Sequence, residues 1–138
     1  MSGRNDWNKN LIEQYRANGG KVNGWNEGKN LLLLTTKGAK TGKERINPVA
    51  FTRDGDRYLV IASKSGGPTN PDWYYNLVAN PTVTIEVGNE KFQAHATVPA
   101  EPERTRLYNQ MAAILPGFAE YQRNTTRKIP LIILEPHK

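Results

Sequence analysis

The sequence contains no cysteine, and this single absence excludes several kinds of chemistry. Disulfide bonds, cysteine nucleophiles and zinc sites built from thiolates are all impossible in such a chain. A protein without disulfides suits a reducing compartment, so we expect a cytoplasmic location. The 138 residues suffice for one domain, residues 1–138, that buries a core without support from a metal or a disulfide.

Long apolar runs are scarce as well. No uninterrupted aliphatic run is longer than Leu31 to Leu34, which is far too short to cross a bilayer. The N-terminus also lacks an apolar signal core behind a basic start. We therefore expect neither a transmembrane segment nor a secretion signal.

Several motifs that would define an enzyme class are missing. Residues 38–43 suggest a nucleotide-binding P-loop, but only three residues separate the two glycines, and Glu44 stands where that motif needs serine or threonine. No Gly-x-Gly-x-x-Gly follows a predicted strand. His95 and His137 lack partners at the spacing of metal ligands. Hydrolysis is therefore not expected, and any reaction would need a cofactor to carry it.

Positive charge is present in excess and is concentrated in one region. The net charge is +6, and seven Lys or Arg residues stand against three acidic residues between Lys37 and Lys64. A local patch of this kind suits a phosphorylated or carboxylated small molecule better than a nucleic acid, which is not expected as a partner.

The densest part of this region is the stretch from Lys37 to Ala50. It places four cationic side chains and two glycines between two apolar runs. Glycine lets backbone N–H groups approach a ligand closely, and the cations can offset several negative charges. The stretch is therefore either a site for a large anion or a solvated hairpin turn.

The hydrophobic pattern predicts about six strands and three or four helices. Strands are predicted over residues 31–36, 46–52, 58–63, 82–87, 91–98 and 129–135, and helices over 6–18, 72–79, 102–115 and 118–123. Short strands joined by tight turns favour a mainly β fold with helices (α+β). We expect a small closed or half-closed antiparallel barrel of residues 31–138, capped by helices.

Particular residues refine this prediction. Pro48 cannot donate to a strand ladder and is expected at an edge or a bulge. Asn70 suits the N-cap of the helix that follows, with Pro71 in its first turn. On the helix over 102–115, an apolar stripe is expected from Leu107, Met111 and Ile114.

The segment 1–20 is expected to form an amphipathic helix that ends at a pair of glycines. Covering an open end of the core is the favoured role. A peripheral membrane contact is the alternative, although the polar face is not strongly basic.

Two groups of aromatic residues stand out in the sequence, and each group has two possible roles. Trp73, Tyr74 and Tyr75 lie on one short predicted helix, and Phe118 and Tyr121 follow a Pro-Gly break. Either group could flank a planar ring, or could serve ordinary core or dimer packing.

Three motifs occur in order and together resemble the deazaflavin-dependent nitroreductase family. They are Gly-Ala-Lys-Thr-Gly-Lys-Glu-Arg-Ile-Asn-Pro, Ala-Ser-Lys-Ser-Gly-Gly and Asn-Pro-Asp-Trp-Tyr-Tyr-Asn-Leu-x-Ala-Asn-Pro. The likeness extends from about Leu31 to the closing apolar strand. It implies a split β-barrel related to FMN-binding, pyridoxamine-phosphate-oxidase-like proteins, often a homodimer, with reduced coenzyme F420 as hydride donor.

The resemblance also implies positions for the coenzyme. Its phosphate and oligoglutamate tail would contact the basic stretch, at Lys37, Ala39, Lys40, Thr41, Lys43 and Arg45. Its ring and phosphate would be bordered by Asn47, Pro48, Val49, Ala50, Ile61, Ala62, Ser63 and Lys64. The short helix would close the groove through Asp72, Trp73, Tyr74, Tyr75 and Asn76.

In this family a hydride passes to an electron-poor acceptor such as a quinone, an enone or a nitroaromatic compound. The resemblance makes Tyr121 and Ser63 candidate proton donors, and Phe118 and Tyr121 candidate substrate contacts. Relatives that reduce nitroimidazoles carry a tyrosine where this chain has Phe118, so the loss of a phenol argues against efficient nitroimidazole reduction. FMN use and a non-catalytic deazaflavin carrier are the alternatives.

Overall fold

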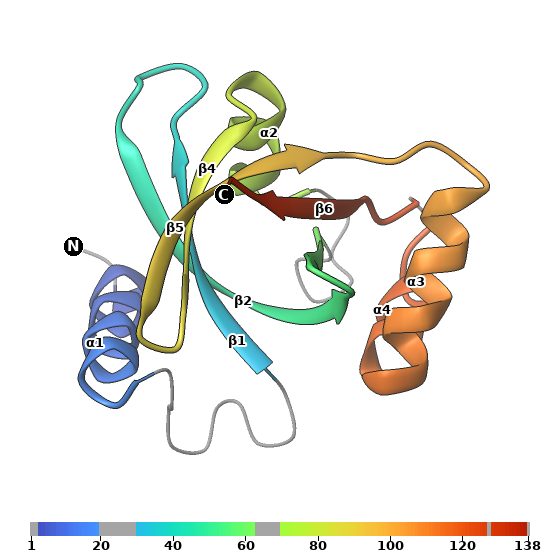
Figure 1. The fold of residues 1–138 in the computed structure, drawn as a ribbon, viewed down its shortest axis with the longest axis horizontal. Coiled ribbons are helices and arrows are strands. Elements are labelled where there is room, and N and C mark those ends of the chain that lie inside the picture. The colour runs from blue at the N-terminus through green and yellow to red at the C-terminus, as the bar shows by residue number, and fades with distance from the viewer. Residues whose placement is uncertain (1–2, 20–29, 63–69, 127, 138) are drawn as a thin grey trace.

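Six antiparallel strands close into a barrel in the order β1-β2-β3-β6-β5-β4 (Figure 1). The computed structural model describes residues 3–19, 30–62, 70–126 and 128–137. The strands are β1 (Asn30–Lys37), β2 (Glu44–Asp54), β3 (Arg57–Ile61), β4 (Thr82–Val87), β5 (Glu90–Thr97) and β6 (Leu131–Pro136). The helices are α1 (Gly3–Ala17), α2 (Asp72–Ala79), α3 (Glu103–Ile114) and α4 (Gly117–Arg123). The predicted elements and the predicted barrel are confirmed.

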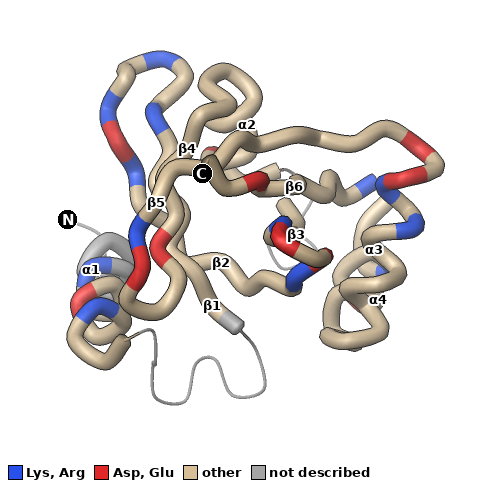
Figure 2. The backbone as a smooth tube through the Cα atoms, in the orientation of Figure 1, with Lys and Arg blue, Asp and Glu red and all other residues tan. Residues whose placement is uncertain are grey.

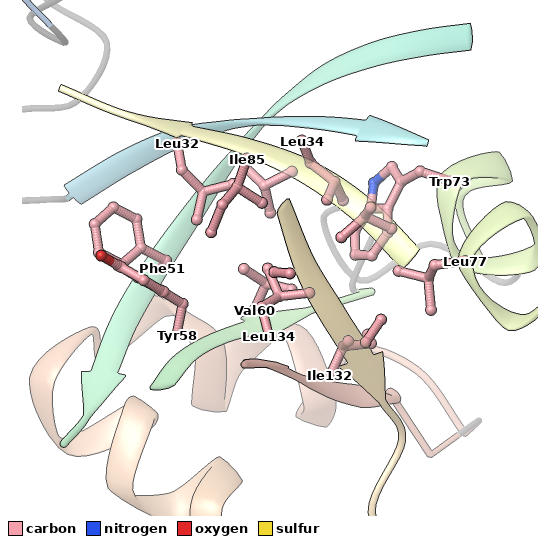
Figure 3. Close-up of a cluster of buried hydrophobic side chains, with 14 of the residues drawn as sticks. Leu32, Leu34, Phe51, Tyr58, Val60, Trp73, Leu77, Ile85, Ile132 and Leu134 are labelled. Carbon is pink, nitrogen blue, oxygen red and sulfur yellow. The ribbon is translucent and has the colours of Figure 1, made fainter. Parts of the chain in front are cut away.

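Alternation along the strands builds the barrel interior. Leu32 and Leu34 of β1 point into a buried cluster to which all six strands contribute. Trp73 and Leu77 of α2 join this cluster and close one end of the barrel (Figure 3). Period-two alternation thus sends one face of each strand inward, and α2 is the helix that caps the interior.

A second hydrophobic layer lies outside the barrel, between β3, β6 and the helices α3 and α4; we call it the α3–α4 cluster. It contains Leu59, Ile61, Leu107, Tyr108, Met111, Leu115, Phe118, Ile129, Leu131 and Ile133. The predicted stripe of α3 is right for Leu107 and Met111 but wrong for Ile114, which is 60% exposed. Tyr108 and Leu115 are buried in its place because this face of α3 meets the barrel and α4.

The predicted role of α1 as a cover for an open barrel end is wrong. Leu11 and Tyr15 of α1 pack instead on Leu31 and Leu33, which point outward from β1. The Tyr15 hydroxyl donates to the Leu31 carbonyl at 2.8 Å and to the Glu86 carbonyl at 3.1 Å. The described apolar side chains of α1 are therefore used in packing on the barrel wall.

None of the described helices is long and apolar enough to cross a membrane. The alternative of a peripheral membrane contact through α1 gains no support, because Leu11 and Tyr15 are buried against the barrel.

Among the described residues, most of strand β2 pairs on one side only. Residues 44–51 pair with β1, while the described pairing with β3 covers only residues 52–54. Pro48 pairs with Leu33 of β1, and the described strands place no partner on its other side, which is consistent with the predicted edge position. The prediction of Asn70 as N-cap is wrong by one position. Pro71 takes the N-cap without a side-chain hydrogen bond, and α2 begins at Asp72.

Candidate functional site

The loop between β1 and β2 is held in a tight shape by its own backbone. The Gly38 N–H donates to the Lys43 carbonyl at 2.7 Å, and the Gly42 N–H donates to the Gly38 carbonyl at 2.9 Å. A Cβ on Gly38 would stand only 2.8 Å from Thr41 Oγ1 and 3.2 Å from the Lys43 carbonyl oxygen, so a side chain here would force Thr41 to move. The Thr41 hydroxyl in turn accepts the Lys43 N–H at 3.2 Å.

This loop and its flanks, residues 37–45, form what we call the basic loop. Its cations Lys37, Lys40, Lys43 and Arg45 are all exposed. None of the four forms an ion pair with another described residue. Figure 2 places this group at the far side of the molecule from α3 and α4. Their charge is therefore available to an external anion, with Glu44 the acidic side chain among them.

Helix α2 fixes the basic loop through one buried side chain. Asn76 Oδ1 accepts the Ala39 N–H at 3.0 Å, and Asn76 Nδ2 donates to Thr36 Oγ1 at 3.2 Å. Asn80 Nδ2 adds a longer contact to the Lys37 carbonyl at 3.5 Å. The Asn76 amide therefore connects α2 to Ala39 of the basic loop and to Thr36 near the end of β1. The contact with Thr36 could not be predicted from the sequence, because 40 residues separate it from Asn76.

The aromatic residues of α2 divide between the core and the surface. Trp73 is buried in the barrel interior, and Tyr74 packs against the same cluster. Tyr75 is 50% exposed and meets Tyr74 edge-to-face, with ring centroids 5.4 Å apart. Asp72 is exposed at the start of the helix. Among these side chains, Tyr75 and Asp72 are the ones open to a ligand.

The positions implied for the ring lie along β2 and the end of β3, but several face the core. Val49 and Ala62 point into the barrel interior, and Ile61 belongs to the α3–α4 cluster. These residues can border a ligand only through their backbone. Pro48 and Ala50 are half-buried on the outer face of β2. Ser63 and Lys64 lie outside the described residues.

Helix α4 brings its two candidate residues together. Phe118 and Tyr121 stack with ring centroids 5.9 Å apart and an interplanar angle of 29°. Phe118 is only 5% exposed, and its carbonyl accepts the Tyr108 hydroxyl at 2.7 Å. Tyr121 and Ala50 both pack against the α3–α4 cluster as half-buried residues. Ala50 on β2 and Tyr121 on α4 therefore border the same hydrophobic cluster.

A depression of about 300 Å³ lies between α3 and α4, and the sequence did not predict it. Arg104, Thr105, Tyr108, Asn109, Ala112, Ala119, Gln122 and Arg123 line it. Arg104 is buried, its guanidinium donates to the Ile129 carbonyl and to Gln122 Oε1, and burial lowers its pKa. Through these hydrogen bonds, Arg104 links α3 to α4 and to the segment just before β6.

The chain matches the family of F420H(2)-dependent quinone reductases over residues 7–136. The chain belongs to this family. The predicted resemblance is confirmed, and with it the class of oxidoreductase and coenzyme F420 as the cofactor of the family.

Individual relatives agree with the family match. An F420H(2)-dependent quinone reductase of Mycobacterium tuberculosis is 44% identical over 108 residues, which cover 75% of this chain and 71% of that protein. A solved structure described as an F420-H2 dependent reductase is 38% identical, with a TM-score of 0.70 over 76% of this chain and 93% of that one.

Two further structures bear on assembly and fold. One described as a domain-swapped dimer is 33% identical, with a TM-score of 0.72 over 96% of this chain and 99% of that one. A pyridoxamine 5′-phosphate oxidase-like protein of Listeria innocua, at 12% identity and a TM-score of 0.55 over 96% of this chain and 93% of that one, shares the fold. The predicted likeness of this family member to pyridoxamine-phosphate-oxidase-like barrels is confirmed.

Proposed function

We propose that this family member transfers a hydride from reduced coenzyme F420 to a quinone. The observation that carries the proposal is the arrangement of described residues along β2. Exposed cations without described ion-pair partners stand at one end, and Ala50 and Tyr121 meet the α3–α4 cluster at the other. Arg45 and Ala50 are five residues apart, or about 17 Å along a strand, which suits a long ligand with an anionic tail and an apolar ring.

The basic loop fits the anionic part of the coenzyme. Lys37, Lys40, Lys43 and Arg45 can hold phosphate and carboxylate groups, because charge-assisted hydrogen bonds to such groups are strong. Asn76 keeps Ala39 and the loop in place, and Tyr75 and Asp72 are exposed on the same helix. Ser63 and Lys64 remain part of the proposed set as implied by the family resemblance.

The ring end of the site is proposed along Asn47, Pro48 and Ala50. When bound, the reduced coenzyme supplies a hydride, so the protein itself has to position the acceptor and deliver a proton. One hydride and one proton convert a quinone to a hydroquinone. Tyr121 is the proposed proton donor or orienting group, with Ser63 as a second candidate.

Acceptors other than quinones are a finer part of the proposal. Enones and nitroaromatic compounds are electron-poor in the same way and would compete for the same place. Phe118 lacks the phenol of relatives that reduce nitroimidazoles, and its ring is buried beside Tyr121. We expect quinones to be reduced faster than nitroimidazoles.

Steady-state oxidation of the reduced coenzyme by a menaquinone analogue tests this function. Turnover that requires the protein, and that falls in Tyr121→Phe through kcat, is the expected result. Coenzyme binding without any turnover would indicate a carrier instead. A yellow protein as purified, with tightly bound FMN, would support the flavin alternative.

A homodimer is proposed as the assembly. The support is a relative of 33% identity whose structure is described as a domain-swapped dimer. Light scattering on the purified protein should give twice the mass of the 15.5 kDa chain, and a monomer mass would refute the dimer.

A further inference from the structure

One buried hydroxyl in the described part of the chain has no hydrogen-bond partner. Thr52 is 3% exposed, and its Oγ1 is the only buried side-chain oxygen or nitrogen among the described residues without a partner. A buried hydroxyl without a partner is unfavourable, and an apolar residue of the same shape would avoid that penalty. Each unsatisfied polar group of this kind in a native protein calls for an explanation, and a functional role is one explanation.

The hydroxyl lies on the outer face of β2, beside the α3–α4 cluster. Side chains two apart on a strand share a face, so Thr52 stands on the same side as Ala50 and Asp54. Thr52 pairs directly with Leu59, which belongs to the α3–α4 cluster. Asp54 Oδ1 accepts Gln110 Nε2 of α3 at 3.5 Å, which places α3 over this end of the strand.

Thr52 lies directly beyond the proposed ring site on the same face of β2. The coenzyme ring is proposed to end at Ala50, and Thr52 follows about 7 Å further along the same face. Leu59, which pairs with Thr52, belongs to the α3–α4 cluster. Tyr121 packs against the same cluster. An acceptor that receives a hydride next to Ala50 would therefore extend toward the Thr52 hydroxyl.

We propose that Thr52 binds the acceptor by donating a hydrogen bond from its hydroxyl to a carbonyl oxygen of the quinone. This inference rests on the proposed function. Thr52 keeps its proton throughout: the hydride comes from the reduced coenzyme, and the proton that completes the hydroquinone comes from Tyr121 or water. Because Thr52 is 3% exposed, the acceptor reaches it when the packing of α3 over this end of β2 loosens.

The test compares variants that keep or remove the hydroxyl. Thr52→Val preserves the shape and removes the unpartnered group, so it should raise Tm by a few degrees in the free protein. It should also weaken menadione binding about tenfold, measured by calorimetry on the complex with oxidised coenzyme and as KM in turnover. Thr52→Ser should bind menadione nearly as well as the wild type. Thr84→Val, a half-buried threonine on β4, is the matched control and should leave menadione binding unchanged.

The readouts separate this inference from the proposed function. Unchanged menadione affinity in Thr52→Val, with normal coenzyme binding, would overturn the role of Thr52 and leave the reductase function standing. Absence of coenzyme binding by the wild type would overturn the proposed function itself, and the role of Thr52 with it. If Thr52→Val does not fold, Thr52→Ala loses the same hydroxyl and is measured in the same way. Amide exchange should also show weaker protection of α3 when menadione is bound.

Discussion

At the scale of single residues, Asn76 links the helix α2 to the basic loop. Its side chain is 8% exposed and has hydrogen bonds on both its oxygen and its nitrogen. The family resemblance assigned this residue to the coenzyme, whereas the structure gives it a loop-holding role that would act on the coenzyme indirectly.

Asn76→Ala should lower the free energy of unfolding by about 1–3 kcal/mol, because the buried Thr36 hydroxyl and the Ala39 N–H lose their partner. Coenzyme affinity should fall as well, since the loop is no longer fixed. Urea unfolding and coenzyme titration measure the two effects. Asn80→Ala is the control, because its contact is long at 3.5 Å and should matter little. An Asn76→Ala protein with wild-type stability and affinity would refute this role.

Phe118 provides a second test at the residue scale. The ring is buried in the α3–α4 cluster, so Phe118→Tyr would insert a hydroxyl into an apolar layer. A loss of about 1–3 kcal/mol in unfolding free energy is expected if the new group finds no partner. If Phe118→Tyr is as stable as the wild type, the phenol has found a partner or solvent, and the packing described for α4 is contradicted.

At the scale of elements, α1 depends on one tyrosine for its docking. The Tyr15 hydroxyl contacts the carbonyls of Leu31 and Glu86 and accepts the Gly88 N–H at 3.0 Å. Arg16 adds a paired contact to the buried Glu86 carboxylate at 2.7 Å. One side chain therefore ties α1 to β1 and to the β4–β5 hairpin.

Tyr15→Phe should destabilise the protein by about 1–3 kcal/mol and increase amide exchange in α1, since the hydroxyl no longer donates to the Leu31 and Glu86 carbonyls or accepts the Gly88 N–H. Burial is the main cause that raises the pKa of Tyr15 above 10.0. A raised pKa means that docking is fully stabilised below pH 10 and is lost as the tyrosine ionises at higher pH. Gln14→Ala, an exposed neighbour, is the control. Unchanged exchange of α1 in Tyr15→Phe would contradict this account.

The elements were predictable from local pattern, but their docking was not. Alternation over 82–87 and 91–98 predicted the β4–β5 hairpin, because one face is buried and the other solvated. The run Leu31 to Leu34 is apolar on both faces, so the sequence did not reveal that Leu31 and Leu33 point outward to receive α1. The role of Asn76 depends on Thr36, a partner far away in the sequence. The role of Thr52 depends on the lack of a hydrogen-bond partner among the described residues, which the sequence does not reveal.

At the scale of the whole molecule, the exposed cations of the basic loop and the buried α3–α4 cluster lie toward opposite ends of β2. The basic loop includes the start of β2, and the strand runs from there toward the side of the molecule where α3 and α4 lie (Figures 1 and 2). Composition and the linked motifs predicted the first end and the cofactor. The second end could not be predicted in the same detail, because it depends on how α3 and α4 pack on the barrel.

The central claim is that the basic loop binds the anionic tail of coenzyme F420. The most direct measurement is a fluorescence titration with the full coenzyme and with an analogue lacking the glutamate tail. Wild-type protein should bind at micromolar concentrations, and Lys40→Ala and Arg45→Ala should weaken binding about tenfold for the full coenzyme but much less for the analogue. Lys91→Ala, an exposed cation on β5, should bind as the wild type does. No binding at micromolar concentrations, or equal losses with both ligands, would contradict the account.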